Sequence, residues 1–337
     1  MSEEVKLRYI SDDIDGIKRF RTGKSFIYLG SKADKIKDKQ TLDRINQLAI
    51  PPAWKNVWIS PFNNSHLQST GFDEKGRKQY LYHPKWTELS QQNKFDKMIY
   101  FGKILPGLRR KVKNDMSKNG LVMDKVIATV VWLLENTFIR VGNTEYAREN
   151  KSYGLTTLHN KHVKVSGSNI KFQFKGKSGV MHSVEVTDKR IAGIVKKCIE
   201  LPGYELFQYV DNLGEIRIID SSDVNEYLRS VTGEDISAKE FRTWGGTVLS
   251  AVTLYNLGNY ESDIVKNDNI KKTVKVVSTH LRNTPSVCLQ YYIHPVVINT
   301  YEKKILVPLF DNLKPKRSEH FSSNEYKVIS LLHKFPQ

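Results

Sequence analysis

Cysteine is nearly absent from this chain of 337 residues, which contains only Cys198 and Cys288. Two cysteines are too few for a disulfide framework or a cysteine zinc site, so the sequence indicates a reducing compartment. Long apolar runs are absent too, because the longest, residues 126–134, is nine residues long, whereas a membrane-spanning helix needs about 20. The N-terminus has neither the basic nor the apolar region of a signal peptide. We therefore expect a protein that is not secreted and does not enter a membrane.

Two signatures of cofactor use are also missing. The triplets Gly-Lys-Ser at residues 23–25 and 176–178 look like the end of a phosphate-binding loop. That loop needs a glycine five positions before the glycine of its Gly-Lys pair, where this chain has Lys18 and Lys171. The sequence contains no His-Glu-x-x-His motif and no carboxylate cluster with two-metal spacing. We expect neither ATP use nor a bound metal, and predict no cofactor.

Positive charge is what the chain has in excess. It contains 53 Lys and Arg against 36 Asp and Glu, a formal net charge of +17. The excess is spread along the chain, with clusters at residues 18–21, 77–78, 109–113 and 271–272. A folded protein whose basic groups line a groove fits a nucleic-acid partner better than a disordered basic arm does. A basic protein with an ordinary solvated face is the alternative.

The N-terminal part has the pattern of a small sheet. Residues 26–29 and 57–59 are β-prone and bounded by Gly, Pro and Asn, and residues 39–49 predict one amphipathic helix that ends at Pro51-Pro52. The stretch 87–93 is polar and lacks strong periodicity. We therefore predict two domains, 1–90 and 91–337.

Beyond residue 90 the pattern is mainly helical, with a small sheet inserted. Three short alternating segments joined by glycine turns predict antiparallel strands at 162–165, 170–174 and 182–186. Apolar spacing predicts helices on both sides of this sheet, at residues 94–105, 121–139, 188–200, 222–231, 237–255 and 286–301. The fold class expected is α+β, a small sheet-containing N-terminal lobe and a mainly helical lobe with a three-stranded antiparallel sheet.

Several short motifs carry a family resemblance. In the first domain the motifs are residues 50–54 and 76–83, and in the second they are residues 138–143, 239–247 and 283–295. The glycine turn at 176–179 lies between the first two motifs of the second domain. Together they resemble the type IB DNA topoisomerases, specifically the short poxvirus-like and bacterial branch. The resemblance covers most of residues 15 to 300. It implies the catalytic fold shared by these enzymes and the tyrosine recombinases, and it implies an enzyme that relaxes supercoiled DNA.

The resemblance also implies the chemistry. In this family a tyrosine oxygen attacks a DNA phosphodiester, leaving a 3′-phosphotyrosyl bond and a free 5′-hydroxyl, and the reverse step reseals the strand without ATP or metal. Tyr292 lies nine residues after Asn283, the family spacing, and matches the nucleophile; its neighbour Tyr291 is the alternative. Arg140 and Arg242 match the two family arginines, whose planar, permanently charged groups suit a phosphorane-like transition state. Ordinary surface salt bridges are the alternative for both.

Two further residues complete the implied catalytic set. Lys177, on the hairpin turn, matches the lysine that protonates the departing 5′-oxygen; Lys175 is the alternative, and so is a solvated lysine without a role. Asn283 stands where the poxvirus pattern has histidine, so it can donate a hydrogen bond but carries no charge. A helix N-cap before Pro285 is the alternative for this asparagine.

A basic and aromatic segment of the first domain predicts DNA contacts. Arg77, Lys78, Gln79, Tyr80 and Tyr82 combine phosphate-reaching cations, an amide that reads base edges, and aromatic rings. By the family resemblance this segment lies in the major groove, whereas simple alternation on a half-exposed strand is the alternative. Lys239, three residues before Arg242, is expected to contact a backbone phosphate.

We interpret the chain as a monomeric clamp for double-stranded DNA, cytoplasmic in a bacterium or encoded by a virus. Two other functions stay open. A tyrosine recombinase shares the chemistry, although His280 and Arg282 have the wrong spacing for its His-x-x-Arg pair. A non-catalytic DNA-binding protein on the same scaffold is the second.

Overall fold

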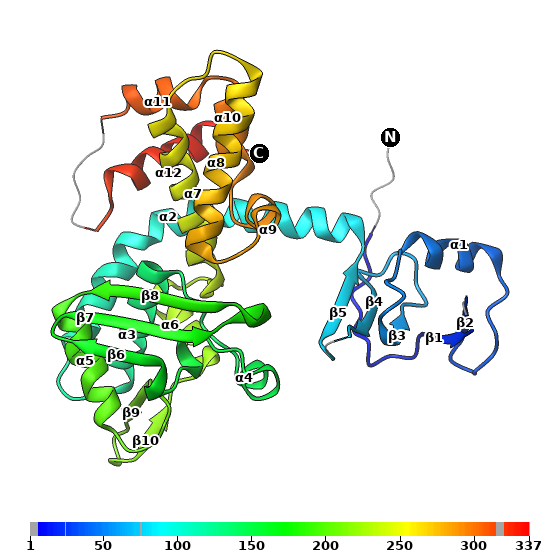
Figure 1. Ribbon diagram of the computed structural model, residues 1–337, viewed down its shortest axis with the longest axis horizontal. Coiled ribbons are helices and arrows are strands. Elements are labelled where there is room, and N and C mark those ends of the chain that lie inside the picture. The colour runs from blue at the N-terminus through cyan, green and yellow to red at the C-terminus, as the bar shows by residue number, and fades with distance from the viewer. Residues whose placement is uncertain (1–5, 24, 75, 315–319, 337) are drawn as a thin grey trace. The chain divides into compact units, whose positions relative to one another are not determined.

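The computed structural model describes residues 6–23, 25–74, 76–314 and 320–336, without the side chains of 91–93. The chain divides into two compact units, Met1–Lys94 and Phe95–Gln337. Figure 1 shows both units with their elements labelled. Each unit is described by itself below. Within the described ranges, none of the helices combines the length and apolarity that crossing a bilayer requires.

The first unit is built on one antiparallel sheet of five strands in the order β2-β1-β3-β4-β5. Its core is small, and among the described residues its buried apolar cluster consists of Ile17, Val57 and Ile59 from the strands and Ile45 from the helix. The elements are β1 (Ile17–Thr22), β2 (Ser25–Leu29), α1 (Lys39–Gln47), β3 (Lys55–Ile59), β4 (Leu67–Phe72) and β5 (Lys78–Tyr82). The strand β5 therefore lies at one edge of the sheet.

The second unit contains the predicted three-stranded sheet, β6 (Val163–Ser166), β7 (Asn169–Lys175) and β8 (Met181–Thr187), paired in that order and antiparallel. The alternation of β7 buries Ile170, Phe172 and Phe174, and the helix α5 (Lys189–Glu200) packs on β6 and β7. A short hairpin of β9 (Gln208–Val210) and β10 (Ile216–Ile218) follows. The predicted three-stranded sheet is confirmed.

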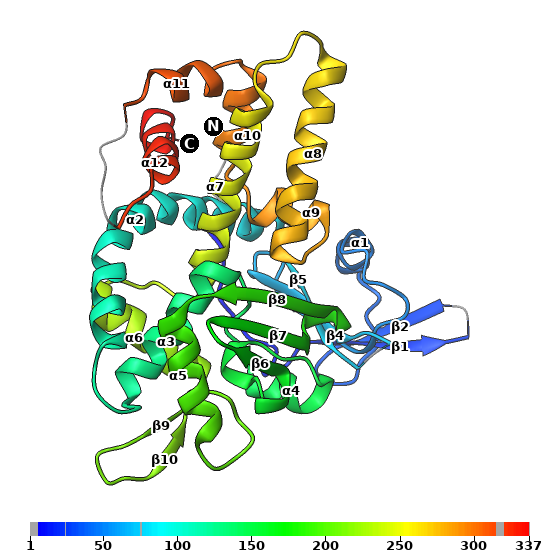
Figure 2. The same cartoon turned by 60° about the vertical axis from the view of Figure 1, so that its left-hand side comes forward.

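Helices make up most of the remaining second unit and form one large apolar core with this sheet. Figure 2 shows α7 and α8 side by side, with α9 near one end of α8. The helices are α2 (Pro84–Met116, which begins in the first unit), α3 (Met123–Thr137), α4 (Thr144–Asn150), α6 (Ser221–Thr232), α7 (Lys239–Leu257), α8 (Asp263–Leu281), α9 (Pro285–Tyr291), α10 (Pro295–Glu302), α11 (Leu306–Asn312) and α12 (Ser323–Lys334). The predicted α+β class, with a sheet-containing N-terminal part and a mainly helical second part, is confirmed.

Two helix predictions were wrong in their limits. The helix expected at 286–301 is two helices, α9 and α10, because Pro295 lacks an N–H and its ring disfavours a helical residue before it. His294 is accordingly extended, and its side chain caps α10 by accepting a hydrogen bond from the Val296 N–H. The helix expected at 94–105 is longer than predicted, because α2 begins at Pro84, a residue suited to the first turn, and continues to Met116.

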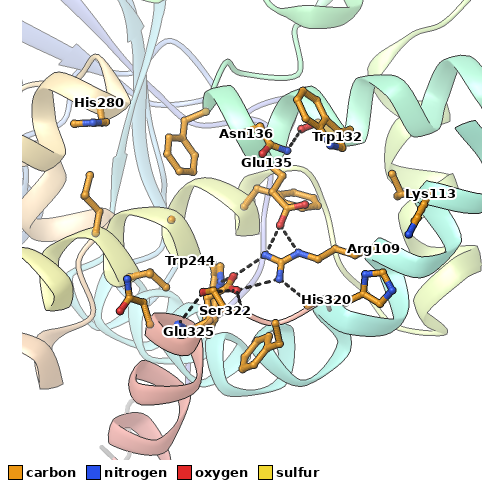
Figure 3. Close-up of a pocket in the computed structure, with 18 of the residues that line it drawn as sticks. Arg109, Lys113, Trp132, Glu135, Asn136, Trp244, His280, His320, Ser322 and Glu325 are labelled. Carbon is orange, nitrogen blue, oxygen red and sulfur yellow. Dashed lines mark hydrogen bonds and ion pairs between the residues drawn. The ribbon is translucent and has the colours of Figure 1, made fainter. Parts of the chain in front are cut away.

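A partly buried ion network joins three helices of the second unit. Arg109 of α2 lies 2.5 Å from Glu135 of α3 and 2.6 Å from Glu325 of α12. Glu325 also accepts a hydrogen bond from the indole N–H of Trp244 in α7. These side chains line a cavity of about 710 Å³ (Figure 3). The network therefore ties the C-terminal helix to the helices that carry the candidate site.

Candidate active site

Arg140 and Asn283 lie in direct contact although they are far apart in the sequence. Arg140 follows α3, which ends where Phe138 takes a left-handed conformation, and Asn283 follows α8. The Arg140 Nη2 donates a hydrogen bond to the Asn283 Oδ1 at 2.7 Å. Thr284, not Asn283, is the N-cap of α9, so the alternative role for Asn283 was wrong. The side chain of Asn283 is thus directed to the arginine.

Arg242 is fixed by backbone carbonyls. It lies on α7 and is 4% exposed; its Nη1 donates to the Phe138 carbonyl, and its Nη2 donates to the Leu281 carbonyl at 2.7 Å. Burial, together with the positive charge of Arg140, lowers the pKa of Arg242 to about 10. The guanidinium therefore stays charged at neutral pH, and its two anchors are neutral groups.

Tyr292 lies against this guanidinium. The Arg242 guanidinium carbon is 5.1 Å from the centre of the Tyr292 ring. Tyr292 is the residue that ends α9, and its carbonyl packs on Gly246 of α7, where a Cβ would lie 2.5 Å from that oxygen. Glycine at 246 thus allows α7 to approach the tyrosine. Tyr291 is exposed, whereas Tyr292 is half-buried.

Lys177 lies on the turn between β7 and β8, and its side chain is exposed. Arg140 donates to Asn283, and Arg242 donates to the Phe138 and Leu281 carbonyls, so these contacts do not involve Lys177. The turn is nevertheless next to them, because His182 packs on Gly176, and the charges of Arg140 and Arg242 act on His182. Lys175, the alternative acid, is also exposed.

Buried polar atoms without a hydrogen-bond partner gather at this site. Seven such side-chain atoms occur in the described part of the chain, and four of them belong to site residues: the Arg242 Nε, the Asn283 Nδ2 and both ring nitrogens of His182. Buried donors normally have partners, since leaving one unpaired costs about 1–3 kcal/mol. Two N–H donors of neighbouring residues are therefore available to an acceptor that the chain does not supply. Within the described ranges, no three His, Cys, Asp or Glu side chains gather as metal ligands would.

Two members of this cluster were not predicted from the sequence. His182 lies on the buried face of β8, where its alternation with Val184 was the available signal. Arg282 immediately precedes Asn283, and its guanidinium donates to the carbonyls of His280 and Thr137. Its charge acts on His182, so it is a third arginine beside the site.

The predicted DNA-contact residues of the first unit lie on β5 and the turn before it. Arg77 and Gln79 both bond to Asp73, at 2.6 Å and 3.0 Å, and Lys78 lies 2.6 Å from Asp12. Tyr80 and Tyr82 stack at 6.2 Å on one face of the strand, 46% and 44% exposed. The cations thus have carboxylate partners that a phosphate can replace. Lys239, in the second unit, is exposed at the first residue of α7.

Comparisons with known proteins agree with this arrangement of elements. Residues 83–308 match the family of the eukaryotic DNA topoisomerase I catalytic core, and residues 25–73 match the N-terminal domain family of bacterial DNA topoisomerase IB. DNA topoisomerase 1B of Acanthamoeba polyphaga mimivirus is 32% identical over 298 residues, which are 86% of this chain and 88% of that protein. DNA topoisomerase 1B of Vaccinia virus (strain Copenhagen) is 23% identical over 244 residues, which are 71% and 74% of the two chains.

The chain belongs to the type IB DNA topoisomerase family, and it is an enzyme of the isomerase class. Its similarity to the mimivirus and Vaccinia virus proteins covers most of their lengths, as expected for a short, poxvirus-like member. The similarity to DNA topoisomerase 1 of Schizosaccharomyces pombe covers 78% of this chain but only 31% of that protein. The resemblance found in the motifs is therefore confirmed.

Proposed function

We propose that this enzyme relaxes supercoiled double-stranded DNA by cutting and resealing one strand through Tyr292, without ATP or a metal ion. The family supports the topoisomerase over the recombinase and the non-catalytic protein. The expected monomer is part of the same proposal, and so are the roles of the two predicted domains, residues 1–90 as a DNA clamp and residues 91–337 as the catalytic domain.

The proposed cleavage step balances as follows. The Tyr292 phenol oxygen forms a bond to phosphorus as its proton passes to a solvent water molecule, and the bond between phosphorus and the 5′-oxygen breaks. Lys177 gives a proton to the departing oxygen, producing a 5′-hydroxyl. The strand then carries a 3′-phosphotyrosyl bond, and resealing reverses each transfer. The Arg242 guanidinium beside the Tyr292 ring stabilises the negative charge that the phenol oxygen gains.

The single observation that carries the proposal is the pair of unpartnered donors, the Arg242 Nε–H and the Asn283 amide. Both belong to side chains fixed by other contacts: Arg242 by two carbonyls and Asn283 by Arg140. Donors fixed in advance stabilise charge that grows in a transition state, and each is worth a factor of about 10²–10³ in rate. We infer that the non-bridging oxygens of the phosphate are their acceptors.

The first unit supports DNA binding through β5. Lys78 and Arg77 would exchange their carboxylate partners for phosphates, Gln79 would reach a base edge, and Tyr80 with Tyr82 would pack on the duplex. Lys239 would add a phosphate contact. DNA is the substrate that the family implies.

Supercoiled plasmid incubated with the protein, EDTA and no ATP tests the proposal. Relaxed topoisomers are expected, whereas unchanged DNA or recombinant products would refute it. Tyr292→Phe should abolish relaxation and leave duplex binding intact, because it removes only the phenol oxygen. Tyr291→Phe is the matched control and should relax the plasmid at the wild-type rate. Mass spectrometry of a trapped adduct should find the DNA on Tyr292 through its 3′ end; an adduct on Tyr291 would overturn the assignment.

A further inference from the structure

His182 is buried beside the site, and the proposed cleavage step gives it no role. Its side chain is 5% exposed on β8, and neither ring nitrogen has a hydrogen-bond partner among the described residues. A buried imidazole in this state is unfavourable by about 1–3 kcal/mol for each unpaired group. An apolar residue would fill this position at a lower free-energy cost, which indicates that the histidine has a function there.

The ring lies between the sheet and the turn that carries Lys177. On one side it stacks on Phe174, with ring centres 4.9 Å apart and an angle of 25°. On the other side it packs on Gly176, where a Cβ would lie 2.4 Å from the His182 Nε2. Only glycine leaves room for this contact. The backbone immediately before Lys177 therefore rests on the edge of the imidazole.

The same turn is closed by short backbone hydrogen bonds. The Gly176 N–H donates to the Val180 carbonyl at 2.8 Å, and the Gly179 N–H donates to the Gly176 carbonyl at 3.1 Å. Ser178 has a left-handed conformation with φ 65°. The turn is thus tight, and displacement of Gly176 would move Lys177 with it.

The imidazole is neutral at this place. Burial lowers the pKa of His182 to about 4, and the charges of Arg282, Arg140 and Arg242 lower it in the same direction. A neutral ring adds no positive charge that would repel Lys177.

We propose that His182 is a positioning residue: its ring supports Gly176 and so sets the reach of Lys177 to the departing 5′-oxygen. The inference rests on the proposed function, in which Lys177 is the acid. Misplacing a catalytic group by about 1 Å can cost about 10²-fold in rate. The defect expected from losing this support is therefore a defect in protonation of the leaving group alone.

Leaving-group chemistry separates this role from a structural one. A duplex substrate with sulfur in place of the 5′-bridging oxygen releases a thiol, whose pKa of about 8.5 lets it depart as thiolate without an acid. We expect His182→Ala and Gly176→Ala, which disturb the contact from its two sides, to slow single-turnover cleavage of the oxygen substrate about 10–100-fold. On the sulfur substrate both variants should stay within about threefold of wild type. His182→Gln gives a second variant should the alanine fail to fold.

Two control variants distinguish a failure of the positioning role of His182 from a failure of the acid assignment of Lys177. Ser183→Ala, at the next and exposed position of β8, should cleave both substrates at the wild-type rate. Equal slowing of both substrates by the His182 variants, or no slowing, would overturn the positioning role. Lys177→Ala should cleave the oxygen substrate slowly and cleave the sulfur substrate at close to the wild-type rate. Restoration in Lys177→Ala without restoration in His182→Ala overturns only the inference, whereas no restoration in Lys177→Ala overturns the acid assignment and the inference together.

Discussion

Replacing Arg242 with lysine should separate the structural from the catalytic work of its guanidinium. Its two Nη atoms donate to the Phe138 and Leu281 carbonyls, and its Nε–H has no partner among the described residues and is the donor that we propose for the phosphate. A lysine has a single nitrogen and cannot reproduce this fork. One carbonyl left unpaired should lower the free energy of unfolding by about 1–3 kcal/mol. Loss of the fixed donor should slow cleavage about 10²–10³-fold, equivalent to about 2.7–4 kcal/mol of transition-state stabilisation.

The two effects need separate assays. Urea unfolding measures the stability, and single-turnover cleavage of a labelled duplex with enzyme in excess measures the chemical step. Arg19→Lys is the matched control, because Arg19 is 9% exposed in the first unit and donates to three carbonyls, those of Ile50, Pro51 and Trp54. It should lose stability and keep its cleavage rate. A cleavage rate of Arg242→Lys within about threefold of wild type would refute the donor role, and equal slowing by both variants would show that stability alone sets the rate.

Three other results are expected. Lys78→Ala should weaken duplex binding and reduce the salt slope of log K by about one, measured by titration at several salt concentrations; an unchanged slope would exclude a phosphate contact. Arg109→Met should lower the free energy of unfolding in urea by about 2–3 kcal/mol, because Glu135 and Glu325 lose their partner in a partly buried site; a change below about 1 kcal/mol would contradict a stabilising role of this network. Burial lowers the pKa of His294 to about 4, so the unfolded chain takes up a proton on this residue at higher pH than the folded chain does. Its contribution to stability should therefore fall as pH drops from about 6.5 toward 4, by about 2 kcal/mol at pH 5. His294→Asn should make the loss of thermal stability between about pH 6.5 and pH 4 smaller than in the wild type, the remainder coming from other buried histidines such as His182, and an equally steep profile would contradict it.

The sequence predicted those elements whose pattern depends on local periodicity. Alternation and glycine turns identified β6 to β8, and apolar spacing identified α3 and α7. The helix α8 was missed because much of its buried face is polar, including Asn269, Thr273 and Ser278, so it lacks an apolar stripe. Its burial depends on the neighbouring α7, which periodicity within α8 does not report.

Motif order identified the candidate site residues, but their mutual geometry required the fold. The contact of Arg140 with Asn283 spans 143 positions of sequence and depends on where α3 and α8 end. Residue type alone does not predict that two backbone carbonyls hold Arg242 or that His182 packs on Gly176. Phe138 illustrates the reason, since its ring contacts Gly245 while its carbonyl holds Arg242.

Backbone carbonyls rather than a carboxylate hold Arg242, and this separates the positioning of the guanidinium from the neutralisation of its charge. A carboxylate fixes a guanidinium in place and also cancels its charge; the Phe138 and Leu281 carbonyls fix it and leave the charge whole. The positive charge of Arg242 is therefore not neutralised by the two groups that hold it. Under the proposed function, the negative charge of the bound phosphodiester neutralises this guanidinium during each turnover. The neutralisation ends when the resealed DNA leaves the site.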